Sequence, residues 1–377
     1  MHWLSCVRLP DATGLWRVGV DDHQFIRAVL PLPTGSSAAG DDWSGDWLSP
    51  MAVDLQINGG LGLAFPELTA NDLPRLLELL ELLWRDGVEA ISPTLVTCGV
   101  GELRQALAVL QEARTLHQPG RCRLLGAHLE GPFLAAARRG AHPRQHLAAP
   151  SLEALNARIC GHEQEIALVT LAPEQTGAEV VIKALGELGI LVSLGHSEAD
   201  EEQASTAFSQ GVRMITHGFN AMAGLHHRAP GPIAAAALRG DIAVGLIADG
   251  VHVAPSMAVL LQRLMPNQVV LVSDALAPYG LADGVHRWDE RALIVEKGSC
   301  RLEDGTLAGV TLPLLEAVRR LARWSGDAGR AIAAATLLPR RVLGGASSAA
   351  EHLLGLPLAH TLRWSGTADD LRWRRAG

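Results

Sequence analysis

Three side chains in this sequence have the types and the positions of a divalent metal site. Glu130, His196 and His217 each end a short apolar run of the kind that forms a buried strand. A hydrolytic zinc site needs about three protein ligands and a water whose pKa falls to about 7 on the metal. A single histidine is as often a structural group bonded to the backbone, but three ligands at successive strand ends favour a metal site. We therefore expect these residues to hold one divalent ion. Zn²⁺ is the first choice, and Fe²⁺ and Mn²⁺ are alternatives because they accept the same ligands.

A fourth residue, the acid Asp274, ends the apolar run at residues 269–274. A carboxylate beside the metal can take a proton from the bound water and deliver it to a leaving group. The alternative is a capping role at a strand-to-helix turn, but the shared strand-end position favours catalysis. Asp249 and His252 follow another run, and two polar groups there more often contact a ligand than form a plain turn.

Anion recognition has weaker signals. Asn220 follows the run that His217 ends, and Arg228 precedes a helix whose N-terminus attracts phosphate. A lone arginine is usually just solvated. His128 points the same way as Glu130 in a regular strand, and we assign it no role.

Apolar runs and helical patterns alternate along most of the chain. Repeated strand–helix units favour a parallel sheet, and eight of them favour a closed (β/α)8 barrel of the α/β class. The alternative is an open doubly wound sheet, but its Gly-x-Gly-x-x-Gly fingerprint is missing. Barrel loops at the carboxyl ends of the strands share one bowl, which would bring the four strand-end residues together. The expected strands are residues 51–58, 88–97, 123–130, 166–171, 191–196, 214–217, 242–249 and 269–274.

The two ends of the chain lack this alternation and resemble short strands. We expect them to form a small accessory β-domain, with residues 1–48 as its N-terminal part, 49–345 as the catalytic barrel and 346–377 as its C-terminal part. Residues 288–307 are expected to form a hairpin inserted after Asp274, because Lys297-Gly and Asp304-Gly favour turns.

The composition limits the partners. Lys and Arg number 32 and Asp and Glu 40, so the net charge is −8, and no basic run interleaves with aromatic residues. A nucleic-acid partner is therefore not expected.

No stretch of about 18 apolar residues predicts a membrane span. The five cysteines form no Cys-x-x-Cys pair and the N-terminus has no signal-peptide pattern, so we expect a cytoplasmic protein.

Several motifs, taken as an ordered set, resemble the N-acetylglucosamine-6-phosphate deacetylase family of the amidohydrolase superfamily. The resemblance covers about residues 48–345, and it is specific only as a set. The motifs are Gly126-Ala-His-Leu-Glu-Gly-Pro-Phe133, Leu194-Gly-His-Ser197, Thr216-His-Gly-Phe-Asn-Ala-Met222, Arg228-Ala-Pro-Gly231, Ile247-Ala-Asp-Gly-Val-His252 and Leu271-Val-Ser-Asp-Ala-Leu-Ala-Pro278.

The resemblance implies hydrolysis of N-acetylglucosamine 6-phosphate to glucosamine 6-phosphate and acetate. Glu130, His196 and His217 would be the metal ligands, Asp274 the acid/base, and His142 the group that polarises the amide carbonyl. It also implies a homodimer, in which Arg228 reaches the neighbouring subunit's phosphate. The implied sugar-phosphate contacts are Ala141, His142, Asn220, Ala221, Arg228, Asp249, Gly250, Val251, His252, Leu307, Ala308 and Gly309.

Two departures from the wider pattern have consequences. Many superfamily members carry a His-x-His pair on the first strand, where this chain has Gln56 and Asn58; neutral amides are poor metal ligands, so a single metal is expected. Val310 stands where the family usually has Ser, which removes a polar group near the substrate. The rival hypotheses are the same reaction on another sugar phosphate, such as the galactosamine epimer, and a barrel that binds sugar phosphate without turnover.

Overall fold

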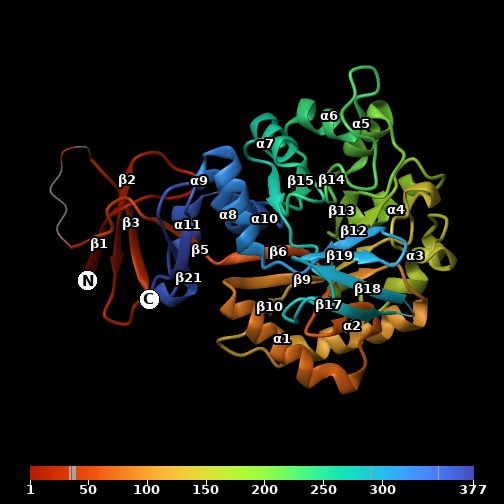
Figure 1. Ribbon diagram of the computed structural model, residues 1–377, viewed down its shortest axis with the longest axis horizontal. Helices are drawn as coiled ribbons and strands as arrows, with labels where there is room; N and C mark the ends of the chain where they lie inside the picture. The colour runs from red at the N-terminus through yellow and green to blue at the C-terminus, as the bar shows by residue number, and fades with distance from the viewer. Residues whose placement is uncertain (34, 36–39, 290, 347) are drawn as a thin grey trace.

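A computed structural model describes residues 1–33, 35, 40–289, 291–346 and 348–377 (Figure 1). A barrel of parallel strands forms its larger part, as the alternating pattern predicted, and strand pairing runs in the order β6-β9-β11-β12-β13-β14-β15-β16. The barrel strands are β6 (Ala52–Ile57), β9 (Val88–Val96), β11 (Ala127–Glu130), β12 (Ile166–Leu171), β13 (Leu191–Leu194), β14 (Val212–Ile215), β15 (Ala243–Leu246) and β16 (Val269–Leu271). A short strand β10 (Arg123–Leu124) also pairs with β9.

Hydrogen bonds just beyond β16 close the barrel against its first strand. Asp274 N donates to Gln56 O at 2.9 Å and Asn58 N donates to Ala275 O at 2.7 Å. The carboxylate of Asp54 accepts from Ser273 N at 3.2 Å on the same seam. The seam therefore places the polar side chains of β6 directly beside Asp274.

Helices cover the outside of the barrel. In α1 (Leu73–Arg85) the buried leucines at 76, 79, 80 and 83 have the spacing of one helical face, which packs on the strands. In α5 (Glu201–Gln210) Asp200 and Gln203 form a capping box that starts the helix. The other covering helices are α2 (Val100–Thr115), α3 (Leu152–Ile159), α4 (Ala178–Glu187), α6 (Gly231–Arg239), α7 (Pro255–Leu264) and α8 (Leu314–Ser325).

A layer of hydrogen-bonded side chains lies inside the barrel. His128 Nε2 contacts Thr170 Oγ1 at 2.7 Å and His128 Nδ1 contacts Thr94 Oγ1 at 3.2 Å. Thr216 Oγ1 lies 2.6 Å from both Thr170 Oγ1 and Ser193 Oγ. Burial lowers the pKa of His128 to about 4, so this histidine is a neutral member of the layer and not a free base.

The insertion after Asp274 is larger than the predicted hairpin. It is an antiparallel sheet of β17 (Gly284–Trp288), β18 (Arg291–Glu296), β19 (Ser299–Leu302) and β20 (Leu307–Val310). Val310 N donates to Asp274 O at 3.2 Å and Leu276 N donates to Val310 O at 2.9 Å, so the sheet is anchored at the end of the last barrel strand. Small strands β7 (Gly59–Gly60) and β8 (Leu63–Ala64) pair beyond β6.

Both ends of the chain meet in a smaller β unit beside the barrel, as predicted (Figure 1). Its first sheet has the order β3-β2-β1-β4, and the second has the order β22-β21-β5, with the C-terminal strand β21 paired to β5. Trp364 of β21 is fully buried, and its Nε1 donates to Ser49 Oγ at 2.9 Å. The strands are β1 (His2–Val7), β2 (Leu15–Val20), β3 (Ile26–Leu32), β4 (Asp41–Asp42), β5 (Trp47–Pro50), β21 (Thr361–Ser365) and β22 (Arg372–Arg375).

The remaining elements are short. The helices α9, α10 and α11 link the barrel to the β unit, and several single 3₁₀ turns lie in the loops. They are α9 (Ala328–Thr336), α10 (Leu338–Val342), α11 (Ala349–Leu353), η1 (Phe65–Glu67), η2 (Ala70–Asp72), η3 (Ala136–Arg138), η4 (Arg144–His146), η5 (Glu163–Glu165) and η6 (Leu358–His360). Within the described ranges, no helix has the length and apolar character needed to cross a lipid bilayer.

Candidate active site

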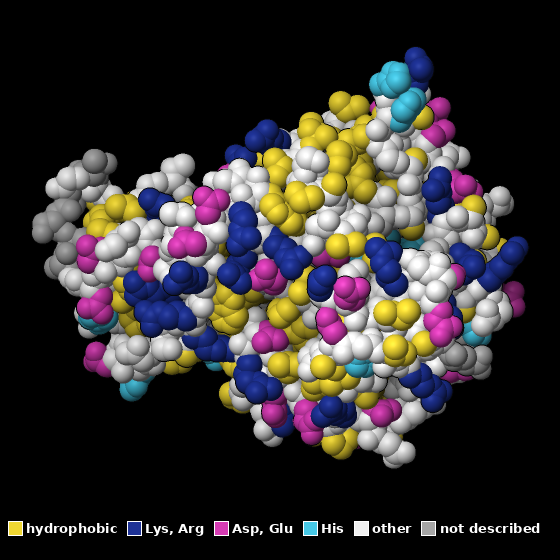
Figure 2. All heavy atoms as spheres, in the orientation of Figure 1, with side chains coloured by type: hydrophobic (Ala, Val, Ile, Leu, Met, Phe, Trp, Pro, Cys, Tyr) yellow, Lys and Arg dark blue, Asp and Glu magenta, His cyan; other side chains and the backbone are white. Residues whose placement is uncertain are grey.

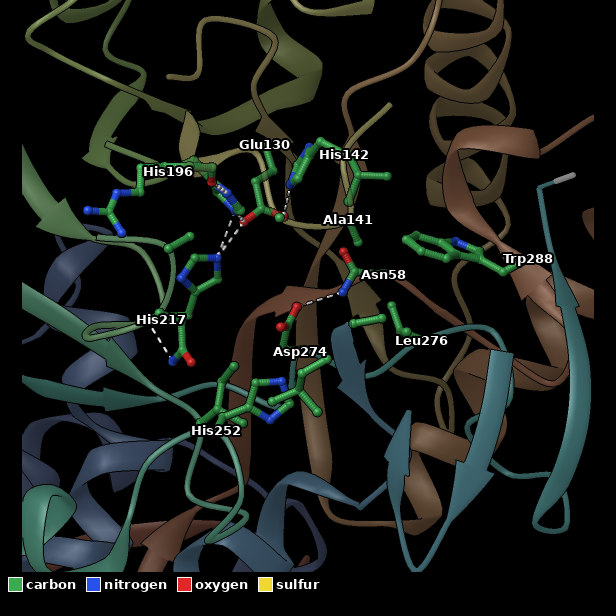
Figure 3. Close-up of a pocket in the computed structure, with 18 of the residues that line it drawn as sticks. Asn58, Glu130, Ala141, His142, His196, His217, His252, Asp274, Leu276 and Trp288 are labelled. Carbon is green, nitrogen blue, oxygen red and sulfur yellow. Dashed lines mark hydrogen bonds and ion pairs between the residues drawn. The ribbon is translucent and has the colours of Figure 1, made fainter. Parts of the chain in front are cut away.

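A cavity of about 310 Å³ opens at the carboxyl ends of the barrel strands (Figure 3). Glu130 comes from the end of β11, while His196, His217 and Asp274 follow β13, β14 and β16 by two or three residues. All four side chains are more than nine-tenths buried, and all four line this cavity. The structure therefore brings together the strand-end residues that the sequence placed on four separate segments.

Glu130, His196 and His217 converge on one point. Glu130 Oε1 lies 3.2 Å from His196 Nε2 and 3.0 Å from His217 Nε2, and the two Nε2 atoms lie 3.0 Å apart. Ligand atoms around a tetrahedral zinc at roughly 2.0–2.1 Å lie roughly 3.3 Å from one another. The three donor atoms thus fit one divalent ion with small outward movements.

The second nitrogen of His196 supports this fit. His196 Nδ1 lies 2.8 Å from the backbone oxygen of Arg138, which can only accept, so Nδ1 carries the proton. The lone pair of Nε2 then faces Glu130 and His217, as in histidines that bind metal through one nitrogen and donate through the other. His217 Nδ1 is buried and has no hydrogen-bond partner among the described residues.

His142 gives a second, looser grouping. Ligand atoms of Glu130, His142 and His196 all lie within 4.8 Å of one another, but His142 Nε2 is 3.7 Å from the other carboxylate oxygen, Glu130 Oε2. His142 Nδ1 lies 3.0 Å from Thr97 Oγ1. The set with His217 is tighter and shares a single oxygen of Glu130, and His142 lies beside it.

Asp274 is joined to the metal set through side-chain amides. Asp274 Oδ1 accepts from Asn58 Nδ2 at 2.7 Å and from Gln56 Nε2 at 3.2 Å. Gln56 Nε2 also donates to Glu130 Oε1 at 3.2 Å. Gln56 of β6 and Asn58 just beyond it therefore donate hydrogen bonds to two carboxylates, whereas a second metal at these positions would need oxygen atoms that accept.

The pKa values follow from burial and charge. Burial opposes ionisation of Glu130, but its close contacts with the imidazoles of His196 and His217 outweigh the burial and hold the pKa of Glu130 well below its usual range. The pKa of Asp274 is raised, first by burial and then by the nearby charge of Glu130. Burial and the neighbouring His196 lower the pKa of His142 to about 3, so His142 is neutral. The two carboxylates of the site therefore differ: Glu130 is ionised, whereas Asp274 holds a proton more readily.

Three of the site residues have an unusual backbone conformation. His196, His217 and Asp274 have φ values of 48°, 29° and 49°, in the left-handed region that non-glycine residues rarely adopt. Such strain persists where surrounding structure holds it, and it clusters at functional sites. Here the turn directs each side chain from the strand end into the cavity (Figure 3).

The expected substrate contacts divide into two groups. His252 lines the cavity, and Asp249 orients it, since Asp249 Oδ2 lies 2.7 Å from His252 Nδ1 and Asp249 Oδ1 accepts from His252 N at 2.8 Å. Asp249 itself, Gly250, Val251, Arg228 and Gly309 are not among the cavity-lining residues. The expected contacts that do line it are Ala141, His142, Asn220, Ala221, His252, Leu307 and Ala308.

Arg228 lies on a loop that projects from the barrel between β14 and α6 (Figure 1). Arg228 and the adjacent His226 and His227 are exposed, and Figure 2 shows His and Lys or Arg side chains gathered at a projecting tip of the molecule. Within one chain the guanidinium therefore stands outside the cavity.

Val310 does not face the cavity. Its side chain is buried in a hydrophobic cluster with Val272, Ile247 and Leu338. Its backbone, and not its side chain, contacts the site, because Val310 N donates to Asp274 O. The valine therefore removes no polar group from the cavity wall.

Several cavity residues were not predicted from the sequence. Val96, Leu276 and Trp288 line the wall beside Ala141, and Thr97 Oγ1 donates to Glu130 O at 3.1 Å. A threonine or an aromatic residue at these positions has no pattern that separates it from ordinary core residues. Two of the unpredicted residues carried a signal, since Leu276 belongs to the motif at residues 271–278 and Asn58 ends the strand expected at residues 51–58.

Comparisons with known proteins agree with this geometry. The chain is 36% identical over 277 residues to N-acetylglucosamine-6-phosphate deacetylase from Vibrio furnissii, covering 74% of this chain and 68% of that one. It is 32% identical over 351 residues to N-acetylgalactosamine-6-phosphate deacetylase from Escherichia coli O157:H7, covering 91% of this chain and 90% of that one. No model of a known protein family matches the chain.

A solved structure extends the likeness to the whole fold. The chain superposes with a TM-score of 0.82 on N-acetyl-D-glucosamine-6-phosphate deacetylase from Mycobacterium smegmatis, a mutant in complex with N-acetyl-D-glucosamine-6-phosphate. The sequences are 26% identical, and the match covers 98% of each chain. With its barrel and its strand-end site, the chain belongs to the N-acetylglucosamine-6-phosphate deacetylase family.

Proposed function

We propose that this protein hydrolyses the N-acetyl group of N-acetylglucosamine 6-phosphate to give glucosamine 6-phosphate and acetate. One observation carries the proposal. The side-chain amide of Gln56 is hydrogen-bonded to two carboxylates, because Gln56 Nε2 lies 3.2 Å from both Glu130 Oε1 and Asp274 Oδ1. A metal-binding group and an acid/base are thereby held side by side in one cavity. Relatives at 36% and 32% identity carry the names of sugar-phosphate deacetylases.

Glu130, His196 and His217 would hold one divalent ion, with Zn²⁺ as first choice and Fe²⁺ or Mn²⁺ as alternatives. A divalent ion in such a site supplies activated water as a nucleophile and polarises a carbonyl oxygen. The protein orients His196 through a hydrogen bond, in which His196 Nδ1 donates to Arg138 O at 2.8 Å.

Asp274 would move the proton. Its raised pKa suits a carboxylate that accepts a proton from water and returns it to the departing amine. Asn58 and Gln56 hold Oδ1, which leaves the other oxygen, Oδ2, to exchange the proton. The amine needs this proton because an unprotonated nitrogen is a poor leaving group.

His142 would bind the amide carbonyl. It is neutral, it lies beside Glu130, and it lines the cavity near Ala141. An imidazole N–H directed at the oxygen stabilises the negative charge that develops as water adds to the carbonyl carbon. Asn220, Ala221 and His252 line the opposite wall and would contact the sugar phosphate, with Asp249 orienting His252.

The active form would be a homodimer. Arg228 stands outside its own cavity on a projecting loop, where an arginine can reach the phosphate of a substrate bound to the neighbouring subunit. The cytosol is the proposed compartment, since all five cysteines are free.

A second substrate is favoured by one comparison. The relative named for N-acetylgalactosamine 6-phosphate matches over 90% of its length, against 68% for the Vibrio relative. These two sugars differ only in the orientation of one hydroxyl group. Acetate release from both sugar phosphates, with parallel metal analysis of the purified protein, tests the proposal. A metal-loaded protein that released no acetate from either would refute it.

A further inference from the structure

A second cavity lies next to the catalytic one and is separated from it by two side chains. It has a volume of about 490 Å³, and its lining shares Val96 and Trp288 with the catalytic cavity. The rest of its wall comes from residues 64–67 around η1, residues 97–102 at the start of α2, residues 139–146 and the residues that follow β17. Trp288 is only 7% exposed and lines both cavities, so its side chain lies between them.

The catalytic cavity has a polar side and an apolar side (Figure 3). His217 and His252 lie on one side, and Ala141, Leu276 and Trp288 lie on the other, with Asp274 and Asn58 between them. Ala141, Leu276 and Trp288 belong to one hydrophobic cluster, which also includes Val96 and Ala308. This apolar side offers no charged group to a sugar or a phosphate.

The geometry of an amide assigns a substituent to each side. A secondary amide is trans by about 2.5 kcal/mol, so its nitrogen substituent and its acyl substituent point in opposite directions. The proposed function, on which this inference rests, places the sugar phosphate on the polar side. The acyl methyl group must then point toward Ala141, Leu276 and Trp288.

Trp288 is held firmly in this position. The guanidinium of Arg291 lies 4.6 Å from its ring centroid, and Arg291 Nη1 donates to Ala141 O at 2.9 Å. Asp289 Oδ2 accepts from Arg291 Nη2 at 2.5 Å, which fixes the arginine. One arginine therefore locks the tryptophan and the loop beside His142 together.

We propose that Trp288 sets the length of the acyl group that this enzyme removes, by closing the acyl side of the catalytic cavity against the second cavity. Removal of the ring would join the two spaces and admit longer N-acyl chains. One methylene in an apolar pocket changes selectivity by roughly 10–200-fold. Wild-type enzyme should therefore prefer N-acetyl over N-butyryl glucosamine 6-phosphate by at least about 10-fold in kcat/KM.

The test compares kcat/KM for the N-acetyl and N-butyryl substrates in wild type and in Trp288→Ala. The ratio of the two values is independent of the fraction of active protein, so a partly folded variant still reports selectivity. We expect the butyryl-to-acetyl ratio to rise at least about 10-fold in Trp288→Ala. Trp288→Leu and Trp288→Phe, which keep more of the cluster packed, should shift the ratio in the same direction by less, and they replace the alanine variant if it does not fold.

Leu293→Ala is the matched control. Leu293 is fully buried in the same cluster but lines neither cavity, so its truncation loosens the sheet without joining the spaces. An unchanged ratio in every Trp288 variant, or an equal rise in Leu293→Ala, would overturn the inference and leave the deacetylase function intact. Wild-type protein without activity on any N-acyl sugar phosphate would overturn both.

Discussion

The Nε2 atom of His217 lies 3.0 Å from the Nε2 atom of His196. His196 carries its proton on Nδ1, so its Nε2 presents a lone pair toward His217 and Glu130. We propose that a divalent ion binds between these two nitrogens and the carboxylate oxygen, which all lie within 3.2 Å of one another.

Metal content should distinguish the ligand histidine from the neighbouring one. His217→Ala removes a direct ligand, and because loss of an outer-shell partner alone costs about 10–100-fold in affinity, we expect a loss beyond about 100-fold. His142→Gln should keep metal affinity within about 10-fold while kcat falls by about 10² or more. Metal titration followed by elemental analysis, together with kinetics, measures both. If His142→Gln lost the metal and His217→Ala kept it, the looser grouping would be the metal site.

Asp274→Asn should retain metal but lose turnover. Asparagine can keep one acceptor oxygen toward Asn58 and Gln56, but it cannot exchange a proton, and a positioned acid/base contributes about 10²–10⁴-fold. The measurement is kcat for acetate release with metal content checked on the same sample. Asp200→Asn, in the capping box of α5, is the control, because it makes the same replacement outside the active site. Near-full activity of Asp274→Asn would remove Asp274 from its proposed role.

Arg228 should act across a dimer interface. Arg228→Ala should raise KM for the phosphorylated sugar far more than for the dephosphorylated sugar, because only the former has the anion. Co-expression of Arg228→Ala with Asp274→Asn, under separate tags, then decides which subunit supplies the arginine. In a random mixture half of the dimers are hybrids and each hybrid has one intact site, so roughly a quarter of all sites would be intact if the contact is between subunits. Hybrids no more active than the two parents would place Arg228 in its own subunit's site or in none.

Asp54 should make the fold less stable as pH rises. Burial raises the pKa of Asp54 from 3.8 to about 7, although Ser273 and Gln56 donate to its carboxylate. Between about pH 4 and pH 7 the unfolded chain ionises this group while the folded chain keeps it protonated, so the free energy of unfolding falls across that window. At 1.36 kcal/mol per pKa unit the loss is at most about 4 kcal/mol.

Asp54→Asn should remove this dependence, because an amide keeps an acceptor for the two backbone donors and has no charge to desolvate. Denaturant midpoints of wild type and variant at pH 4, 5.5 and 8 give the measurement. The variant should gain stability relative to wild type as the pH rises. Parallel curves for the two proteins would show that Asp54 is ionised in the folded state throughout.

Much of the architecture was predictable because its causes are local. The leucine spacing of α1 and the short apolar runs act within a few residues, and they predicted the strands and the helices that cover them. The inserted sheet was predicted to be only a hairpin, because one of its strands lacks such a local signal. Its first strand, β17, pairs with β18 through cross-strand contacts and has little periodic signal of its own.

By itself, the sequence determined which residue types end the barrel strands, and hence that carboxylates and imidazoles would share one rim. The tertiary structure alone decided how they face one another. Gln56 bridges Glu130, 74 residues away, and Asp274, 218 residues away, because barrel closure brings β6 beside β16. The partition formed by Trp288 and Val96 likewise depends on where the inserted sheet packs on the barrel. Such contacts follow from side-chain packing between distant segments, which leaves no mark in local spacing.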